Sequence, residues 1–284
     1  MSTARLPTGN TAMLSSEFLN GIRIVTMAQN VPGPLAIARL AQAGARVTKI
    51  EPPSGDPMLL LSPAWHAEMH SGISIERLDL KADTGRARLT TLLRDADVFL
   101  TSQRPSVLAR LGLDPDTLRA QHPRLRTLRI VGSVRDPEQP GHDLTYQAQS
   151  GLLGDGMPRA LLADVMTSER AFGCVLALLR LPPGATMDVG LVESLEPLVA
   201  SLRHGLTTPT GVLGGGASRY GVYPTKSGCI AVAALEPHFA TRLFQQLDLP
   251  MDADPSSRFL ERTALEWEAW ARERDLPIVA VATD

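Results

Sequence analysis

Cysteine is scarce in this chain of 284 residues, which holds only Cys174 and Cys229. The two lie far apart, and neither has a His or another Cys nearby at the spacing of metal ligands. This pattern argues against a disulfide framework and against a zinc site. We therefore expect no metal site and a reducing, cytoplasmic setting.

An excess of one charge is also missing. The 28 Lys and Arg residues nearly balance the 30 Asp and Glu residues, for a formal net charge of −2. A nucleic-acid-binding protein would show a basic field, so we expect no nucleic-acid partner. No apolar run approaches the length of about 18 residues that indicates a membrane span. The first 18 residues also lack the continuous apolar stretch of a secretory signal, so we expect neither membrane insertion nor export.

What the sequence does contain, from Gly21 to about Gly132, is an alternation of short β-branched runs with helical stretches. Such alternation is typical of βα units that build a mainly parallel sheet, so the predicted fold class is α/β. The predicted strands are Ile22–Val25, extended to Thr26, Arg46–Ile50, Asp97–Leu100 and Leu125–Val131.

The first of these units has the clearest boundaries. After the strand that ends at Thr26, Pro34 is the expected first residue of a helix, and Gly44 is expected to end it. A strand, a tight turn and a helix start in this order would point free backbone N–H groups into a crevice. That setting suits an anionic ligand.

The second half of the chain changes composition abruptly between Thr207 and Gly216, where Thr, Pro and Gly dominate. We interpret residues 206–220 as a linker between a large domain, 19–205, and a small α+β domain, 221–284. Two core helices are expected in the large domain, over Val165–Leu179 and along the face marked by Leu191 and Leu195. The expected elements of the small domain are strands Gly221–Thr225 and Cys229–Ala234, with helices that start near Pro237 and near Thr263.

Three short segments carry candidate acid and base groups. They contain His142 in Pro140–Leu144, Asp164 in Leu162–Val165, and Glu236 in Ala234–Phe239. An imidazole and two carboxylates suffice to move a proton on and off carbon. Each residue also has a structural interpretation: His142 as a turn residue, Asp164 as the N-cap of the helix that follows it, and Glu236 as an acid at a helix start.

These segments, taken in order with several others, resemble the family III CoA-transferases and, within them, the α-methylacyl-CoA racemase branch. The resemblance covers roughly residues 19–282. The further segments that carry it are Leu19–Val25, Pro32–Pro34, Gly44–Pro53, Leu78–Lys81, Arg104–Pro105, Arg110–Leu113 and Tyr220–Thr225.

The resemblance implies a Rossmann-like large domain that binds CoA, and a homodimer whose chains interlock. It implies an acyl-CoA substrate with no cofactor other than the CoA that the substrate carries. The implied CoA-binding residues are Pro32, Gly33, Arg104 and Arg110, and the implied catalytic residues are His142, Asp164 and Glu236. His142 and Asp164 would flank the α-carbon of the thioester, and Glu236 would hydrogen-bond the imidazole. Because the chain stops soon after Val279, we expect a shortened member without the family's C-terminal return segment.

Three functions remain open at this point. The first is an acyl-CoA racemase or epimerase that acts on a 2-methyl-branched acyl-CoA by two-base proton transfer. The second is a CoA-transferase with Asp164 as its nucleophile. The third is an inactive CoA-binding or partner subunit, which the replacement of a family Lys-Arg pair within Gly72–Ile75 supports. His142 favours the first, because a transferase needs only the carboxylate.

Overall fold

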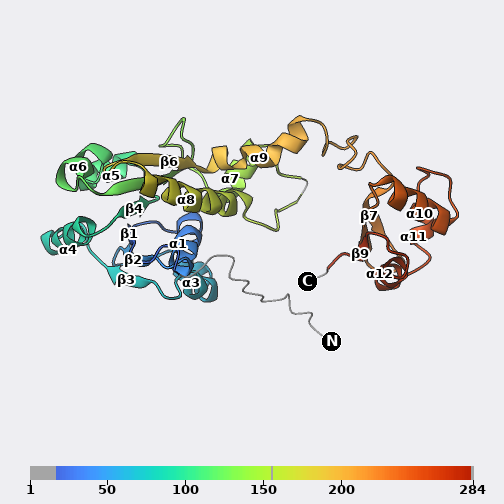
Figure 1. The fold of residues 1–284 in the computed structure, drawn as a ribbon, viewed down its shortest axis with the longest axis horizontal. Coiled ribbons are helices and arrows are strands. Elements are labelled where there is room, and N and C mark those ends of the chain that lie inside the picture. The colour runs from blue at the N-terminus through green and yellow to red at the C-terminus, as the bar shows by residue number, and fades with distance from the viewer. Residues whose placement is uncertain (1–16, 155, 283–284) are drawn as a thin grey trace. The chain divides into compact units, whose positions relative to one another are not determined.

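The computed structural model describes residues 17–154 and 156–282, which form two compact units (Figure 1). The first unit ends at Glu196 and the second begins at Pro197. The strands are β1 (Arg23–Thr26), β2 (Arg46–Glu51), β3 (Ser74–Arg77), β4 (Val98–Thr101), β5 (Arg126–Val131), β6 (Thr186–Gly190), β7 (Tyr220–Pro224), β8 (Cys229–Ala233) and β9 (Ile278–Ala280). The helices are α1 (Pro32–Gln42), α2 (Met58–Leu61), α3 (Pro63–Met69), α4 (Asp83–Arg94), α5 (Pro105–Leu111), α6 (Pro115–Gln121), α7 (Asp143–Gln149), α8 (Leu162–Arg180), α9 (Leu191–Arg203), α10 (Pro237–Leu247), α11 (Ser256–Phe259) and α12 (Ala264–Arg272).

The first unit is built on a six-stranded sheet in the order β3-β2-β1-β4-β5-β6. Every neighbouring pair in this sheet is parallel. From β1 the chain adds β2 and then β3 on one side, and it crosses to the other side only at β4. The loops that follow β1 and β4 therefore diverge, and in doubly wound sheets ligands bind in the crevice that opens there. The α/β prediction is confirmed.

Helices cover the sheet because the side chains of each strand alternate between its two faces. Val25 of β1 and Phe99 of β4 are buried against Leu89 of α4, Leu108 of α5 and Leu118 of α6. Helices α1 and α8 pack on each other, and α8 also packs on β5 and β6, as Figure 1 shows. The long helix α8 is thus held in the core by α1, β5 and β6. These contacts fix the position of its first turn.

The start of helix α1 differs from the prediction. Helix α1 begins at Pro32, two residues before the predicted Pro34, because a proline with its fixed φ suits the first helical position at Pro32 equally well. The helix ends before Gly44, which has a φ of +104°, as its glycine predicts. Strands β3 and β6 were not predicted.

The second unit holds an antiparallel sheet in the order β7-β8-β9, packed against α10, α11 and α12. Its core is aromatic: Trp267 meets Phe259 and Trp270 edge to face, at centroid distances of 5.3 and 5.0 Å, and its indole N–H donates to the Phe259 carbonyl. The presence of a small α+β unit is confirmed, and the domain bounds and the linker at 206–220 stay predictions. Within the described residues, no helix has both the length and the apolar character needed to cross a membrane.

Candidate active site

A cavity of about 130 Å³ lies in the first unit at the carboxyl edge of the parallel sheet. Its lining comes from segments that follow three different strands. Gln29 and Pro32 follow β1, Ser102 and Arg104 follow β4, and Gly132 follows β5. The strand order brings these segments together, since β1, β4 and β5 are neighbours in the sheet. The cavity also contains His142, Tyr146 and Asp164 among its lining residues.

Three backbone donors of the turn after β1 are bonded within the protein. The N–H of Ala28 donates to the hydroxyl of Thr26, and that of Gln29 donates to the hydroxyl of Ser102. The N–H of Asn30 donates to the carboxylate of Asp56. These bonds stabilise the turn and take up these three donors, and anion binding at the start of α1 stays a prediction.

His142 is the N-cap residue of α7. Its backbone is fixed by Thr145, whose hydroxyl donates to the His142 carbonyl at 2.8 Å and accepts from the His142 N–H at 3.0 Å. This reciprocal pairing leaves the imidazole free of a capping role while it holds the main chain. The side chain is exposed and lines the cavity, as a group that exchanges protons with a ligand must.

Tyr146 is buried between two glycines that the sequence did not mark as part of a site. A Cβ on Gly132 would lie 2.5 Å from the Tyr146 hydroxyl oxygen, and a Cβ on Gly141 would lie 2.5 Å from its ring carbon Cζ. Only glycine permits the ring at this place. Burial raises the pKa of Tyr146, with opposing effects from the charges of Arg104 and Asp164, so the phenol stays protonated at neutral pH.

Asp164 is the third residue of α8, and the residue is buried, with an exposed fraction of 9 %. The N-cap of this helix is Leu161, so the prediction of Asp164 as the N-cap is wrong: the helix starts earlier than its apolar pattern indicated. Burial in the cavity wall, followed by the charge of nearby Asp143, raises the pKa of Asp164 to about 7. A carboxyl group with this pKa can both give and take a proton near neutral pH.

Asp143 is a neighbour of Asp164 that was not predicted from the sequence as a site residue. Its carboxylate is buried and accepts a hydrogen bond from the backbone N–H of Asp164 at 3.1 Å. Its second oxygen accepts from the Gln147 side-chain amide at 2.5 Å, and the same amide donates to the Ala160 carbonyl. The position directly after His142 was the one available signal for it.

Of the four residues implied for CoA binding, two line the cavity. Pro32 lies in its wall at the start of α1, and Arg104 lies there as the N-cap of α5. Gly33 is buried against Ala28 and is not among the described residues that line this cavity or its neighbour. Arg110 is exposed in the last turn of α5 and likewise lines neither cavity.

The neighbouring cavity is larger, about 570 Å³, and it shares Gln29 with the first. Its wall combines the end of β2 with the segment after β3, including Pro52, Leu78 and Lys81. Apolar walls with a few polar groups are the usual environment for a long, partly apolar ligand. Gln29 lines both cavities, so they lie next to each other.

Glu236 belongs to the second unit, where it is the N-cap of α10 and is exposed. The helix starts at Pro237, as predicted, and the Glu236 carbonyl accepts the first helical hydrogen bond from Ala240. The structure therefore brings His142 and Asp164 together in one cavity of the first unit, and Glu236 is on the other unit.

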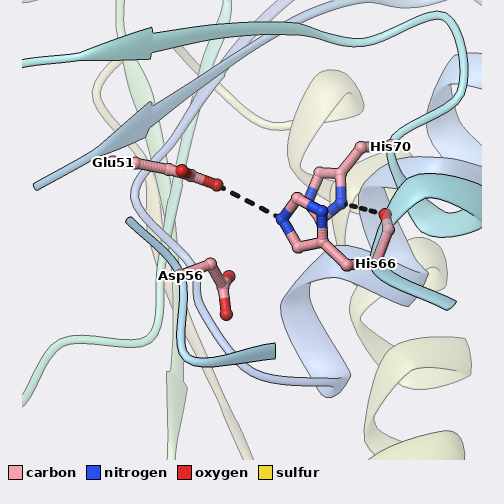
Figure 2. Close-up of side chains that lie close together, drawn as sticks. All are labelled: Glu51, Asp56, His66 and His70. Carbon is pink, nitrogen blue, oxygen red and sulfur yellow. Dashed lines mark hydrogen bonds and ion pairs between the residues drawn. The ribbon is translucent and has the colours of Figure 1, made fainter. Parts of the chain in front are cut away.

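A second cluster of titratable groups lies at the end of β2, where Glu51, Asp56, His66 and His70 offer ligand atoms within 4.8 Å of one another (Figure 2). Its centre holds the buried ammonium group of Lys49, which lies 3.2 Å from Glu51 and 2.5 Å from Asp56. The lysine supplies the positive charge that a metal ion would otherwise bring. We interpret the cluster as a buried ion network that joins β2 to α3.

The histidines of this network have a defined arrangement. His70 directs Nδ1 to the His66 carbonyl at 2.6 Å, so in its neutral form Nε2 accepts from Lys49 at 2.8 Å. Burial, with contributions from the charges of Lys49 and His66, lowers the pKa of His70, which favours that neutral form. His66 Nε2 faces Glu51 at 3.5 Å, as Figure 2 shows.

Comparison with known proteins decides the family. The family model for "CoA-transferase family III" matches residues 19–273. The chain belongs to the family III CoA-transferases. This confirms the resemblance read from the sequence, and it gives the two cavities a family context in which CoA-dependent chemistry is expected.

The relatives of this family III member include one named for the CoA-transferase family and one named as a racemase. A "CaiB/baiF CoA-transferase family protein ZK892.4" of Caenorhabditis elegans is 29% identical over 286 residues, covering 88% of this chain and 82% of the relative. The human "Alpha-methylacyl-CoA racemase" is 31% identical over 288 residues, covering 88% of this chain and 74% of the relative. The solved structure of Rv3272 from Mycobacterium tuberculosis shares the fold with a TM-score of 0.79 at 24% identity, over 93% of this chain and 84% of that one.

Proposed function

We propose that this family III member is an acyl-CoA racemase or epimerase that moves the α-proton of a 2-methyl-branched acyl-CoA. The supporting observation is that His142 and Asp164 line one cavity from the starts of two different helices. The name of the human relative agrees with this reaction. Asp164, with a pKa of about 7, has a proton affinity close to that of an imidazole, which suits a reaction that runs in both directions.

The proposed reaction has two steps that balance without a cofactor. One of the two residues takes the α-proton as the C–H bond breaks, and the electron pair moves onto the thioester carbonyl to form an enolate. The other residue then gives its proton to the opposite face of the α-carbon, and the carbonyl is restored. Each turnover therefore exchanges the protonation states of His142 and Asp164, and the reverse reaction resets them.

Arg104, Pro32 and Glu236 also have roles in the proposed reaction. Arg104 would meet a phosphate or the thioester end of the substrate, and Pro32 would shape the entrance beside it. Glu236 would hydrogen-bond His142 and stabilise its imidazolium form, with the second unit supplied within a homodimer. The CoA arm would pass Gln29 into the larger cavity, which has room for its pantetheine or adenine end.

A CoA-transferase is the second candidate, and the buried carboxylate of Asp164 is the observation that favours it. A transferase would use this carboxylate as the nucleophile on an acyl-CoA, passing through a mixed anhydride and an enzyme-bound CoA thioester. The name of the Caenorhabditis elegans relative agrees with that activity. A nucleophile must be ionised, however, and a pKa of about 7 leaves much of Asp164 protonated at neutral pH.

Incubation of a 2-methylacyl-CoA with the protein in deuterated water, followed by mass spectrometry, separates these functions. The racemase predicts one deuteron gained at the α-carbon, with the gain lost in His142→Ala and in Asp164→Asn but kept in the exposed control His204→Ala. A transferase predicts no exchange and CoA transfer to a free acid, abolished by Asp164→Asn alone. Neither activity, with CoA still bound, would indicate the partner-subunit interpretation.

A further inference from the structure

Among the residues that the structure describes, Asp143 is the one buried carboxylate that accepts a hydrogen bond from the main chain of Asp164, and the proposed reaction gives it no step. Its side chain is 4 % exposed and makes two hydrogen bonds. One oxygen accepts from the Asp164 N–H at 3.1 Å and the other accepts from the Gln147 amide at 2.5 Å. The bond to Asp164 joins the first residue of α7 to the first turn of α8 across 21 residues of sequence, and the bond to Gln147 lies within α7.

Asp143 joins the starts of α7 and α8, and these two helix starts carry the proposed acid and base. His142 immediately precedes Asp143, and Asp164 is itself the residue whose backbone Asp143 binds. Gln147 extends the link, because its amide also donates to the Ala160 carbonyl in the segment that leads into α8. One carboxylate and one amide thus link the two segments that carry the reacting groups.

We propose that Asp143 is a positioning residue for the reaction, one that fixes Asp164 relative to His142 through the joined starts of α7 and α8 and places a fixed negative charge beside the Asp164 carboxyl. The inference rests on the proposed function for its catalytic meaning. Asp143 does not line the cavity among the described residues, so it acts through Asp164 and does not touch the substrate.

The charge of Asp143 has a definite effect in this position. Two neighbouring carboxylates disfavour each other's ionisation, and Asp143 is, after burial, the cause of the raised pKa of Asp164. The other titratable or charged groups near Asp164 are His142 and Tyr146 on the α7 side and Arg104 after β4. Helix α1, which packs on α8, contributes Arg39, and this residue is paired with Glu169 of α8.

Two substitutions separate placement from charge. Asp143→Asn keeps an oxygen for the Asp164 N–H and removes the charge. Gln147 can then turn its amide to present its oxygen, which has no hydrogen-bond partner in the structure, but it loses its bond to the Ala160 carbonyl, so this variant is judged by the midpoint and not by turnover. Asp143→Glu keeps the charge and moves it by one methylene. We expect the Asn variant to lower the titration midpoint of Asp164 by about one unit, the size expected for one neighbouring charge. We expect the Glu variant to keep the midpoint and to lose about tenfold or more in turnover, with KM little changed.

The readouts are ¹³C NMR titration of the Asp164 carboxyl in the full chain, assigned with Asp164→Asn, and the pH profile of α-proton exchange. A lower midpoint for the Asn variant in both readouts supports the proposal. An unchanged midpoint in the Asn variant, or wild-type turnover in the Glu variant, overturns it. If the Asn variant does not fold, the turnover of the Glu variant alone decides. Failure of the proposed function is distinct: wild type would show no exchange at all, while the NMR titration would still report the effect of Asp143 on Asp164.

Discussion

Lys49 and Asp56 form an ion pair of 2.5 Å in which both side chains are completely buried. The same Asp56 accepts hydrogen bonds from the N–H groups of Asn30 and Met58, so the pair connects β2 to the turn that lines the smaller cavity. A buried pair contributes little when intact, because desolvation offsets the attraction. Breaking it leaves an uncompensated charge in the interior.

The change Lys49→Met should therefore destabilise the protein by about 3 kcal/mol or more, because Glu51 and Asp56 lose their common cation. Denaturant unfolding followed by circular dichroism measures the effect. Lys81→Met is the matched control, since Lys81 is exposed, and it should change the free energy of unfolding by less than about 0.5 kcal/mol. Equal losses in the two variants would contradict the interpretation of the cluster as a buried ion network.

Because its pKa is raised, Asp164 should make the folded protein less stable at high pH, although the proposed reaction needs this residue. The folded state holds a proton on Asp164 up to a pH of about 7, whereas the unfolded chain releases it near pH 4. The free energy of unfolding should consequently fall as the pH rises through this window. Asp164→Asn should be inactive but more stable than wild type at pH 8, by on the order of 2 kcal/mol, and no more stable at pH 4. Parallel stability curves for the two proteins between these pH values would show that Asp164 is not held protonated.

Arg104 and Arg110 lie six residues apart in the sequence and should differ in their effect on ligand binding. Arg104 lines the smaller cavity, whereas Arg110 is exposed and lines neither cavity. Arg104→Gln should weaken CoA binding about tenfold through the loss of a charge-assisted contact, and Arg110→Gln should change it less than twofold. Isothermal titration with CoA measures both constants. A larger loss for Arg110→Gln would place the CoA phosphates outside the two cavities.

A substitution at Gly33 tests whether the start of α1 can tolerate a side chain. A Cβ at Gly33 would lie 2.2 Å from the Cβ of Ala28, which is itself completely buried. Gly33→Ala should therefore cost about 2 kcal/mol of stability through overpacking. Gly173→Ala in α8 should be neutral or stabilising, because no atom lies within 4 Å of its added Cβ and alanine favours a helix. Thermal unfolding of the two variants gives the comparison, and a stable Gly33→Ala variant would mean that the turn after β1 can move.

The sequence predicted the parallel sheet because its central strands are short, β-branched and buried, and helical stretches separate them. Strand β3 was missed because its burial pattern is that of an exposed edge, with polar Ser74, Glu76 and Arg77 around a single Ile75. Strand β6 was missed for a related reason: it is the other edge of the sheet, and its first residues are only half buried. An edge strand has one neighbour, so its pairing is decided by the fold and leaves little trace in local composition.

The candidate site was predicted in part. His142 and Asp164 were selected from their segments, and the structure brings both to one cavity. The contacts of Asp164 with Asp143 and Tyr146 could not be predicted, because they depend on how α7 packs on α8, which no local sequence pattern specifies. Gly33 was assigned to CoA on its position, but its close approach to Ala28 gives a packing reason for glycine there. The roles of the site residues stay predictions that the experiments above test.

The order in which the cavity-lining segments occur along the chain bears on synthesis at the ribosome. Gln29, Ser102 and Gly132 emerge early, whereas Asp164 follows on α8 and Leu191 comes last, after β6. A nascent chain can pair β1 to β5 before either late element is available. The carboxyl group that completes the acid/base pair is thus added to a sheet already able to form, and ligand binding in the smaller cavity should begin only once residue 191 has left the exit tunnel.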